Sequence, residues 1–359
     1  MTTPHDAGNS PEQQPAATRR RSPFTRRRTF TAIAALTVAT AALTALGTQA
    51  NAATPSAKPA AAKAGSASPV ATGVPLAAKQ AAAPAQGVAK SFVGTFTPED
   101  GSTVGVGMPV SINFDKPITD KVAVQSHISV TSSSGQQVVG HWFSSTRLDL
   151  RPQAYWKAGS HVTMKLNLGG VKGGAGIYGV QNKTVNFTVG RSQVSTVDTV
   201  THMMTVVRDG KVIRTIPVSS GGPGHETYNG QMVISEKDQT TRMNGATVGL
   251  IDKTTGKSEY DIPDVPHAMR LTTSGTFIHG NYWAAPSAFG TANTSHGCIG
   301  MQDAKGGNDP NTPASWFYNN SLIGDVVTVT GSPSPTVPAD NGLNGWNLSW
   351  SQWLAGSAL

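Results

Sequence analysis

The stretch from His279 to Cys298, HGNYWAAPSAFGTANTSHGC, contains the only cysteine of this 359-residue chain. A single thiol cannot form an internal disulfide, so Cys298 is either inert or a nucleophile. A nucleophilic thiol needs a base, since at neutral pH only about a few per cent of free cysteine is ionised. His279 and His296 precede Cys298 and offer that base. Gly297 and Gly300 flank it and would let backbone N–H groups approach a bound carbonyl, as an oxyanion hole requires.

Taken singly, a cysteine is usually a small core residue, and a histidine usually a structural hydrogen-bonding group. The whole pattern is more specific: His279-Gly280, a connection containing glycine and aromatic residues, then Ser295-His296-Gly297-Cys298. This pattern resembles the signature of the L,D-transpeptidase family, whose catalytic domain is called YkuD-like. The resemblance implies acyl transfer through a cysteine thioester.

The resemblance also implies a role for each residue of the motif. Cys298 is the expected nucleophile, and His279 is the expected base that takes its proton. The backbone carbonyl of Gly280 is expected to hold the other imidazole nitrogen, where a triad acid would stand. Ser295 and His296 are expected to brace the cysteine loop.

A second set of residues is expected to contact substrate. The family has a tryptophan lining the pocket four residues after the histidine, and a flexible Gly- and Thr-rich lid earlier in the chain. The positions that this implies are Trp283, Tyr282 beside it, Met243 and Tyr260 at the lid ends, Ser295 and Gly300. Two positions depart from the family pattern: Gly300 stands where many relatives have Asn, and Val248 where close relatives have Tyr.

The resemblance implies a substrate class. Family members cut a peptidoglycan stem tetrapeptide between its third residue, a diamino acid, and D-alanine, and then join the acyl group to the side-chain amine of a neighbouring stem as a 3→3 cross-link. Carbapenem-type β-lactams are the implied inhibitors, and no cofactor is implied. Two alternatives remain open: an L,D-carboxypeptidase on the same substrate, and a non-catalytic cell-wall-binding module in which Cys298 is dispensable.

A zinc site is the competing chemistry, because His267, His279, His296 and Cys298 are all zinc-compatible ligands. The sequence contains no cysteine pair and no HExxH motif. The side chains of His296 and Cys298 would also have to point apart from a tight glycine-containing loop. We therefore predict no metal among these residues.

Residues 1–52 are predicted to be an export signal. Six arginines between positions 19 and 28 precede an apolar run from Thr31 to Leu46 and an Ala50-Asn51-Ala52 cleavage pattern. The pair Arg27-Arg28 fits a twin-arginine signal loosely. The absence of a cysteine after the apolar run argues against a lipid anchor, so we expect the protein in the cell wall or on the extracellular face of the membrane. Much of the formal charge of +8 lies in this leader, and nucleic acid is not an implied partner.

The remaining chain is predicted to be mainly β. Residues 53–91 form an Ala/Pro/Lys-rich linker, and the short alternating segments of residues 92–190 predict an immunoglobulin-like β-sandwich with Phe114, Trp142 and Trp156 in its core. Segments of this region resemble the bacterial immunoglobulin-like domain of actinobacterial L,D-transpeptidases. Residues 191–331 are the expected β-rich catalytic domain, with one short helix at 313–320.

The last residues, 332–359, contain Trp346, Trp350 and Trp353. Spacings of four and three place these indoles on one helical face, and a cluster of indoles at a terminus is rarely left in water. The pattern predicts a short helix docked on the catalytic domain. We expect a monomer.

Overall fold

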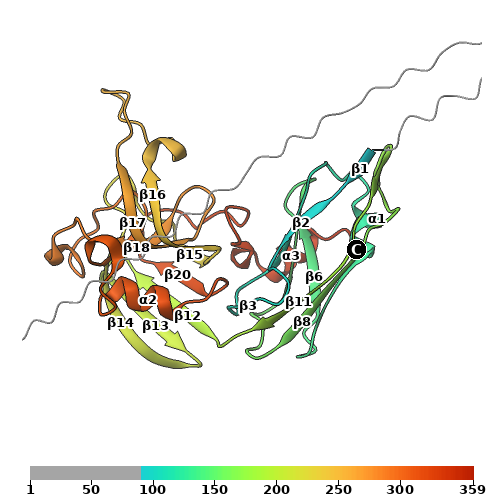
Figure 1. The fold of residues 1–359 in the computed structure, drawn as a ribbon, viewed down its shortest axis with the longest axis horizontal. Coiled ribbons are helices and arrows are strands. Elements are labelled where there is room, and N and C mark those ends of the chain that lie inside the picture. The colour runs from blue at the N-terminus through green and yellow to red at the C-terminus, as the bar shows by residue number, and fades with distance from the viewer. Residues whose placement is uncertain (1–89) are drawn as a thin grey trace, which may run out of the picture. The chain divides into compact units, whose positions relative to one another are not determined.

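The computed structural model describes residues 90–359, which Figure 1 draws in colour. The predicted signal peptide and all but the last two residues of the predicted linker lie outside the described residues. Within residues 90–359, no helix is long and apolar enough to cross a membrane. The described chain is mainly β, which confirms the predicted fold class.

The first part of the described chain forms the immunoglobulin-like sheets. One four-stranded sheet has the order β2 (Gly94–Thr97), β4 (Val110–Phe114), β7 (Arg147–Pro152) and β6 (Val138–Trp142). The other has the order β3 (Thr103–Val104), β11 (Asn182–Val189), β8 (His161–Asn167) and β5 (Ile128–Ser132). A smaller sheet contains β1 (Lys90–Phe92), β10 (Ile177–Gly179) and β9 (Lys172–Gly174).

These sheets share one apolar core because their strands alternate between buried and exposed side chains. In β8, Val162, Met164 and Leu166 are buried while the residues between them are not. The predicted core residues Phe114, Trp142 and Trp156 are all buried in this cluster. The helix α1 (Lys121–Ser126) was not predicted, since six residues capped by Asp120 are too short for a helical period to show in the sequence.

The second part of the chain forms a single nine-stranded sheet. Its order is β15 (Gly230–Val233), β20 (Val326–Thr330), β12 (Gln193–Asp198), β13 (Met203–Arg208), β14 (Lys211–Ser219), β19 (Ile299–Gln302), β18 (Phe277–Asn281), β17 (Asp261–Arg270) and β16 (Glu236–Asn244). The predicted helix is present as α2 (Pro313–Asn320), with the side chain of Thr312 capping its first turn. Phe317 of α2 is buried in the core of this sheet.

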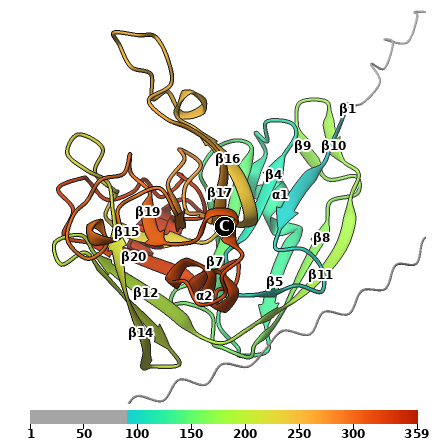
Figure 2. The same cartoon turned by 60° about the vertical axis from the view of Figure 1, so that its left-hand side comes forward.

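Two features of this sheet position the functional residues. The strands β18 and β19 are adjacent and parallel, which places His279 opposite Gly300. Between β16 and β17 the chain leaves the sheet as a long excursion, residues 245–260, which begins with the short helical turn η1 (Gly245–Val248) and projects away from the strands in both views (Figures 1 and 2). This excursion is the segment predicted to be the lid.

The C-terminal segment differs from its prediction. It contains the turn η4 (Gly345–Asn347) and the helix α3 (Trp350–Ala355), so Trp346 and Trp353 are not on one helix. Trp353 stacks on His141 of β6 with ring centroids 4.8 Å apart, and its Nε1–H donates to the carbonyl of Val139. The helix α3 thus docks on the immunoglobulin-like sheet, whereas the sequence predicted docking on the catalytic domain, which the segment contacts through residues that include Asn344 and Asn347 at β15.

A buried arginine explains this docking. The guanidinium of Arg151 in β7 lies 4.4, 5.5 and 4.2 Å from the ring centroids of Trp346, Trp350 and Trp353. Cation–π attraction is strongest for desolvated indoles, so the buried guanidinium of Arg151 holds the three rings together. The spacing of the tryptophans indicates an apolar face, but nothing in that spacing specifies its partner.

Trp353→Ala is expected to destabilise the protein by about 3–5 kcal/mol, because the indole is fully buried against the immunoglobulin-like sheet. Its neighbour Leu354 is 43% exposed, and Leu354→Ala should stay within about 0.5 kcal/mol of the wild type. Chemical denaturation of both variants measures this difference. Equal midpoints would contradict the docking described above.

Candidate active site

The sheet brings Cys298 and His279 to one cavity. Cys298 directly precedes β19, and His279 lies on the neighbouring parallel strand β18. Both side chains line a cavity of about 220 Å³. Its wall is formed by Met243, Tyr260, Ile262, His279, Asn281, Trp283, Ala284, Thr294, Ser295, His296 and Cys298.

His279 is held as a neutral base. Its Nδ1 lies 2.9 Å from the backbone oxygen of Gly280, and since a carbonyl only accepts, Nδ1 carries the proton and Nε2 keeps its lone pair. This is the contact predicted for Gly280. Trp283 stacks on the imidazole with centroids 5.6 Å apart and an angle of 13°. Burial lowers the pKa of His279 below its ordinary 6.5, so the ring is neutral at neutral pH.

Cys298 is held as a neutral thiol. Only 8% of the residue is exposed, and it packs with Met243, Val265 and Phe277. This burial raises the pKa of the thiol to about 11. The thiol donates to the carbonyl of Gly275 at 3.6 Å. A neutral thiol and a neutral imidazole that line one cavity suit general-base catalysis, in which the proton moves as the sulfur attacks, better than a preformed ion pair.

The loop before the cysteine is fixed by hydroxyl groups. Ser295 Oγ donates to the carbonyl of Cys298 at 2.5 Å and accepts from the N–H of Gly297 at 3.2 Å. The buried Thr227, which the sequence did not indicate, donates from Oγ1 to the carbonyl of Gly297 at 2.9 Å. Gly297 has φ of 110°, a region that residues with a Cβ rarely adopt. Ser295 therefore braces the loop as expected.

His296 has a different environment from the one expected. Its Nε2 lies 3.6 Å from Glu259 Oε2, and its ring lies beside those of His225 and Tyr260, at centroid distances of 4.8 and 5.1 Å. Within residues 90–359 its side chain makes no hydrogen bond to the cysteine loop. The cysteine loop is thus held by Ser295 and Thr227, and His296, the second residue expected to brace it, instead faces Glu259 in the lid excursion.

The glycine after the catalytic histidine lies against a buried polar pair. A Cβ on Gly280 would stand 2.0 Å from Asp303 Oδ2, so the position admits only glycine. The same oxygen, Oδ2 of Asp303, lies 2.7 Å from Nδ1 of His267, and Nε2 of His267 lies 3.0 Å from the side-chain amide of Gln239. His267 is therefore committed to Asp303, and the zinc set considered from the sequence does not assemble.

A side-chain amide fills the space that Gly300 leaves open. A Cβ on Gly300 would lie 3.3 Å from Nδ2 of Asn281, whose Oδ1 accepts the N–H of Ala284 at 2.9 Å. Asn281 lines the cavity next to Cys298. The sequence predicted only backbone donors here, since Asn281 lies on the neighbouring strand β18, two residues beyond His279, which is the partner of Gly300.

The expected substrate-contacting residues divide into two groups. Met243, Tyr260, Trp283 and Ser295 line the cavity, and Trp283 is 43% exposed at its rim. Tyr282 does not line it, since its hydroxyl donates to Asp264 Oδ1 at 2.5 Å. Gly300 lies in the strand β19 and contributes no lining atoms.

A second hollow of about 440 Å³ adjoins the first. Tyr260 and His296 line both of them. Val248 of η1, one of the two departures from the family pattern, lines only the second. Val248 thus lies on the lid side of the site and against Gly275, whose carbonyl oxygen is 3.6 Å from the sulfur of Cys298.

A buried thiol and an oriented imidazole line one cavity at neighbouring strands, and this arrangement is suited to acyl transfer by a cysteine nucleophile. Residues 192–329 match the family model of the L,D-transpeptidase catalytic domain (YkuD), and residues 66–172 match that of a bacterial Ig domain. The chain is 30% identical to L,D-transpeptidase 1 of Mycobacterium tuberculosis over 241 residues, which cover 67% of this chain and 85% of that protein. The chain belongs to the L,D-transpeptidase family.

Two further similarities support this assignment. L,D-transpeptidase 2 of Mycobacterium tuberculosis is 33% identical over 262 residues, covering 73% of this chain but only 61% of that relative's length. The structure of the L,D-transpeptidase LdtMt1 in complex with imipenem matches with a TM-score of 0.55 and 28% identity, covering 67% of this chain and 99% of that one.

Proposed function

We propose that this protein is a peptidoglycan L,D-transpeptidase that forms 3→3 cross-links. The observation that carries the proposal is the pairing of Cys298 with His279 in one cavity, where the carbonyl of Gly280 leaves Nε2 of the imidazole free to accept a proton. The family membership supplies the substrate class. The arginine-rich and apolar leader supports an extracellular location, where peptidoglycan lies.

In the first half-reaction the sulfur of Cys298 attacks the carbonyl of the third stem residue while its proton passes to His279. The bond from that carbonyl to D-alanine breaks, and His279 returns the proton to the leaving amine. The product is a thioester on Cys298. The side-chain amide of Asn281 lines the same wall and is our candidate donor to the oxyanion.

In the second half-reaction the side-chain amine of an acceptor stem attacks the thioester. His279 takes a proton from this amine, and the sulfur leaves and is reprotonated. The two hollows that share Tyr260 and His296 offer separate approaches for donor and acceptor. Water in place of the amine would give the L,D-carboxypeptidase reaction.

Incubation with a disaccharide tetrapeptide is expected to release D-alanine and to give a cross-linked dimer of stems. Mass spectrometry of the products separates the candidates. A tripeptide without dimer would identify a carboxypeptidase, and folded protein that releases no D-alanine would favour a wall-binding module. Intact-mass measurement in the same experiment should show one acyl group on the protein.

A further inference from the structure

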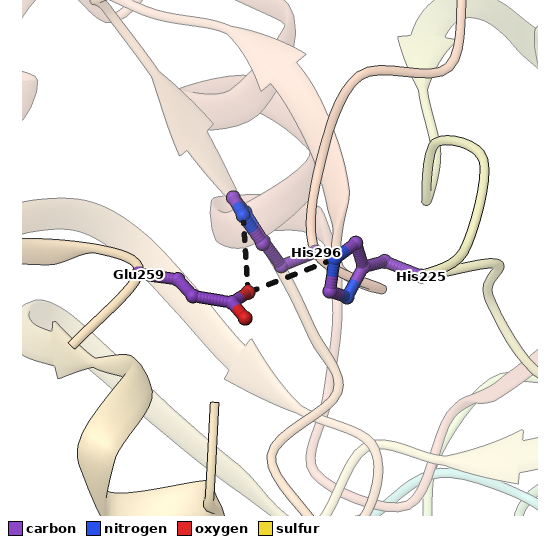
Figure 3. Close-up of side chains that lie close together, drawn as sticks. All are labelled: His225, Glu259 and His296. Carbon is purple, nitrogen blue, oxygen red and sulfur yellow. Dashed lines mark ion pairs between the residues drawn. The ribbon is translucent and has the colours of Figure 1, made fainter. Parts of the chain in front are cut away.

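We propose that His225, Glu259 and His296 form a binding site for a divalent cation, best suited to zinc, beside the loop of Cys298 (Figure 3). The site goes beyond the transpeptidase reaction proposed above. It uses none of the residues that form the Cys298–His279 pair.

The three side chains come from segments that are far apart in the sequence. His225 lies in the connection between β14 and β15, Glu259 ends the lid excursion between β16 and β17, and His296 precedes Cys298 by two residues. Figure 3 shows the carboxylate of Glu259 facing both imidazoles. Within residues 90–359, this is the one group of three such side chains whose ligand atoms converge.

The distances suit a bound ion better than direct hydrogen bonds. Glu259 Oε2 lies 3.6 Å from Nε2 of His225 and 3.6 Å from Nε2 of His296, and the ligand atoms of all three lie within 4.8 Å of one another. A hydrogen bond from N–H to oxygen spans about 2.7–3.2 Å. Tetrahedral ligands about 2.0–2.1 Å from a zinc ion lie about 3.3 Å from one another, so ligand atoms now 3.6 to 4.8 Å apart would have to approach by about 1.5 Å or less to coordinate one.

The donor set indicates the ion. Two imidazoles and one carboxylate are a known zinc ligand set, and nitrogen ligands disfavour magnesium and calcium, which prefer oxygen. Within the described chain, neither imidazole donates or accepts another side-chain hydrogen bond, so both Nε2 atoms are available. The side chains of His225, Glu259 and His296 are 33%, 25% and 37% exposed, which allows an ion to enter and leaves a fourth position for water.

A bound ion would join the lid to the nucleophile's loop. Glu259 is adjacent to Tyr260, which lines both hollows, and His296 is held two residues from the sulfur. The ion would fix the end of the lid excursion over the second hollow. Zinc would thus order the lid and control access to the site without touching the sulfur.

Isothermal titration calorimetry of the full-length protein with Zn²⁺ tests whether His225, Glu259 and His296 bind the ion. Because Cys298 could itself bind zinc, the Cys298→Ala variant is the reference, and we expect it to take up one ion as tightly as the wild type. His225→Ala and the nearly isosteric Glu259→Gln should each weaken binding at least about tenfold. His161→Ala, which removes an exposed histidine on β8, should not change it.

A second measurement reports on the lid and needs no substrate. Lys253 and Lys257 are exposed in the excursion, so trypsin should cut there, and zinc should slow this cleavage in the wild type but not in Glu259→Gln. The proposal is overturned if the wild type takes up no zinc, if Cys298→Ala abolishes the uptake, or if both ligand variants bind as the wild type does. Since neither measurement uses a stem peptide, their outcome is independent of the transpeptidase activity.

Discussion

Cys298→Ala is expected to abolish covalent acylation and to lower cross-linking turnover by about 10⁴-fold or more, because the chain has no other thiol on which a thioester could form. Alanine removes one buried atom and leaves the loop bonds of Ser295 and Thr227 in place, since these use backbone groups. The variant should therefore remain folded while losing its chemistry.

Intact-mass analysis after incubation with imipenem measures this effect. We propose that carbapenems acylate Cys298, since a structurally similar L,D-transpeptidase is known in complex with imipenem. The wild type should gain one adduct and the alanine variant none. An adduct that persists in Cys298→Ala would place the nucleophile elsewhere and remove the basis of the proposed function.

His279→Gln is expected to slow acylation by about 10²–10⁴-fold, because glutamine cannot accept the thiol proton during attack. The lowered pKa of His279 determines in which direction the acylation rate changes with pH. Burial holds the pKa of His279 below 6.5, so the neutral base is present above that pH and is lost only as the pH falls through its lowered value. The wild-type rate should therefore persist through pH 6.5 and fall at more acidic pH.

The variant should show the opposite profile. Without a base, the reaction depends on free thiolate, and burial raises the pKa of Cys298 to about 11, so the residual rate should climb with pH throughout the alkaline range. The rate of acylation by imipenem, measured against pH with a chelator present, tests both the acidic fall of the wild type and the alkaline rise of the variant. His161→Ala should reproduce the wild-type curve. If His279→Gln keeps the acidic limb, another group is the base.

Local features of the sequence determine much of the secondary structure and part of the site. The alternating strands of the immunoglobulin-like sheets and the Thr312-capped helix at 313–320 are set by residues close in sequence, whose side-chain period and capping chemistry are readable directly. The Cys298 and His279 pair was predictable for a related reason: neighbouring parallel strands hold it, and the motif specifies both of them. The placement of residues that belong to one motif is thus accessible from the sequence alone.

Tertiary structure decided the features that depend on distant segments meeting. The sequence showed an indole cluster around Trp353 but not that Arg151, on the other part of the chain, would collect it. It did not reveal that Asn281 fills the space left by Gly300, or that His225 and Glu259 converge on His296. Side-chain period and spacing record which face of an element is apolar or polar. The period and the spacing do not show which other surface an apolar or polar face packs against, because the packing of the whole sheet and its lid determines that contact.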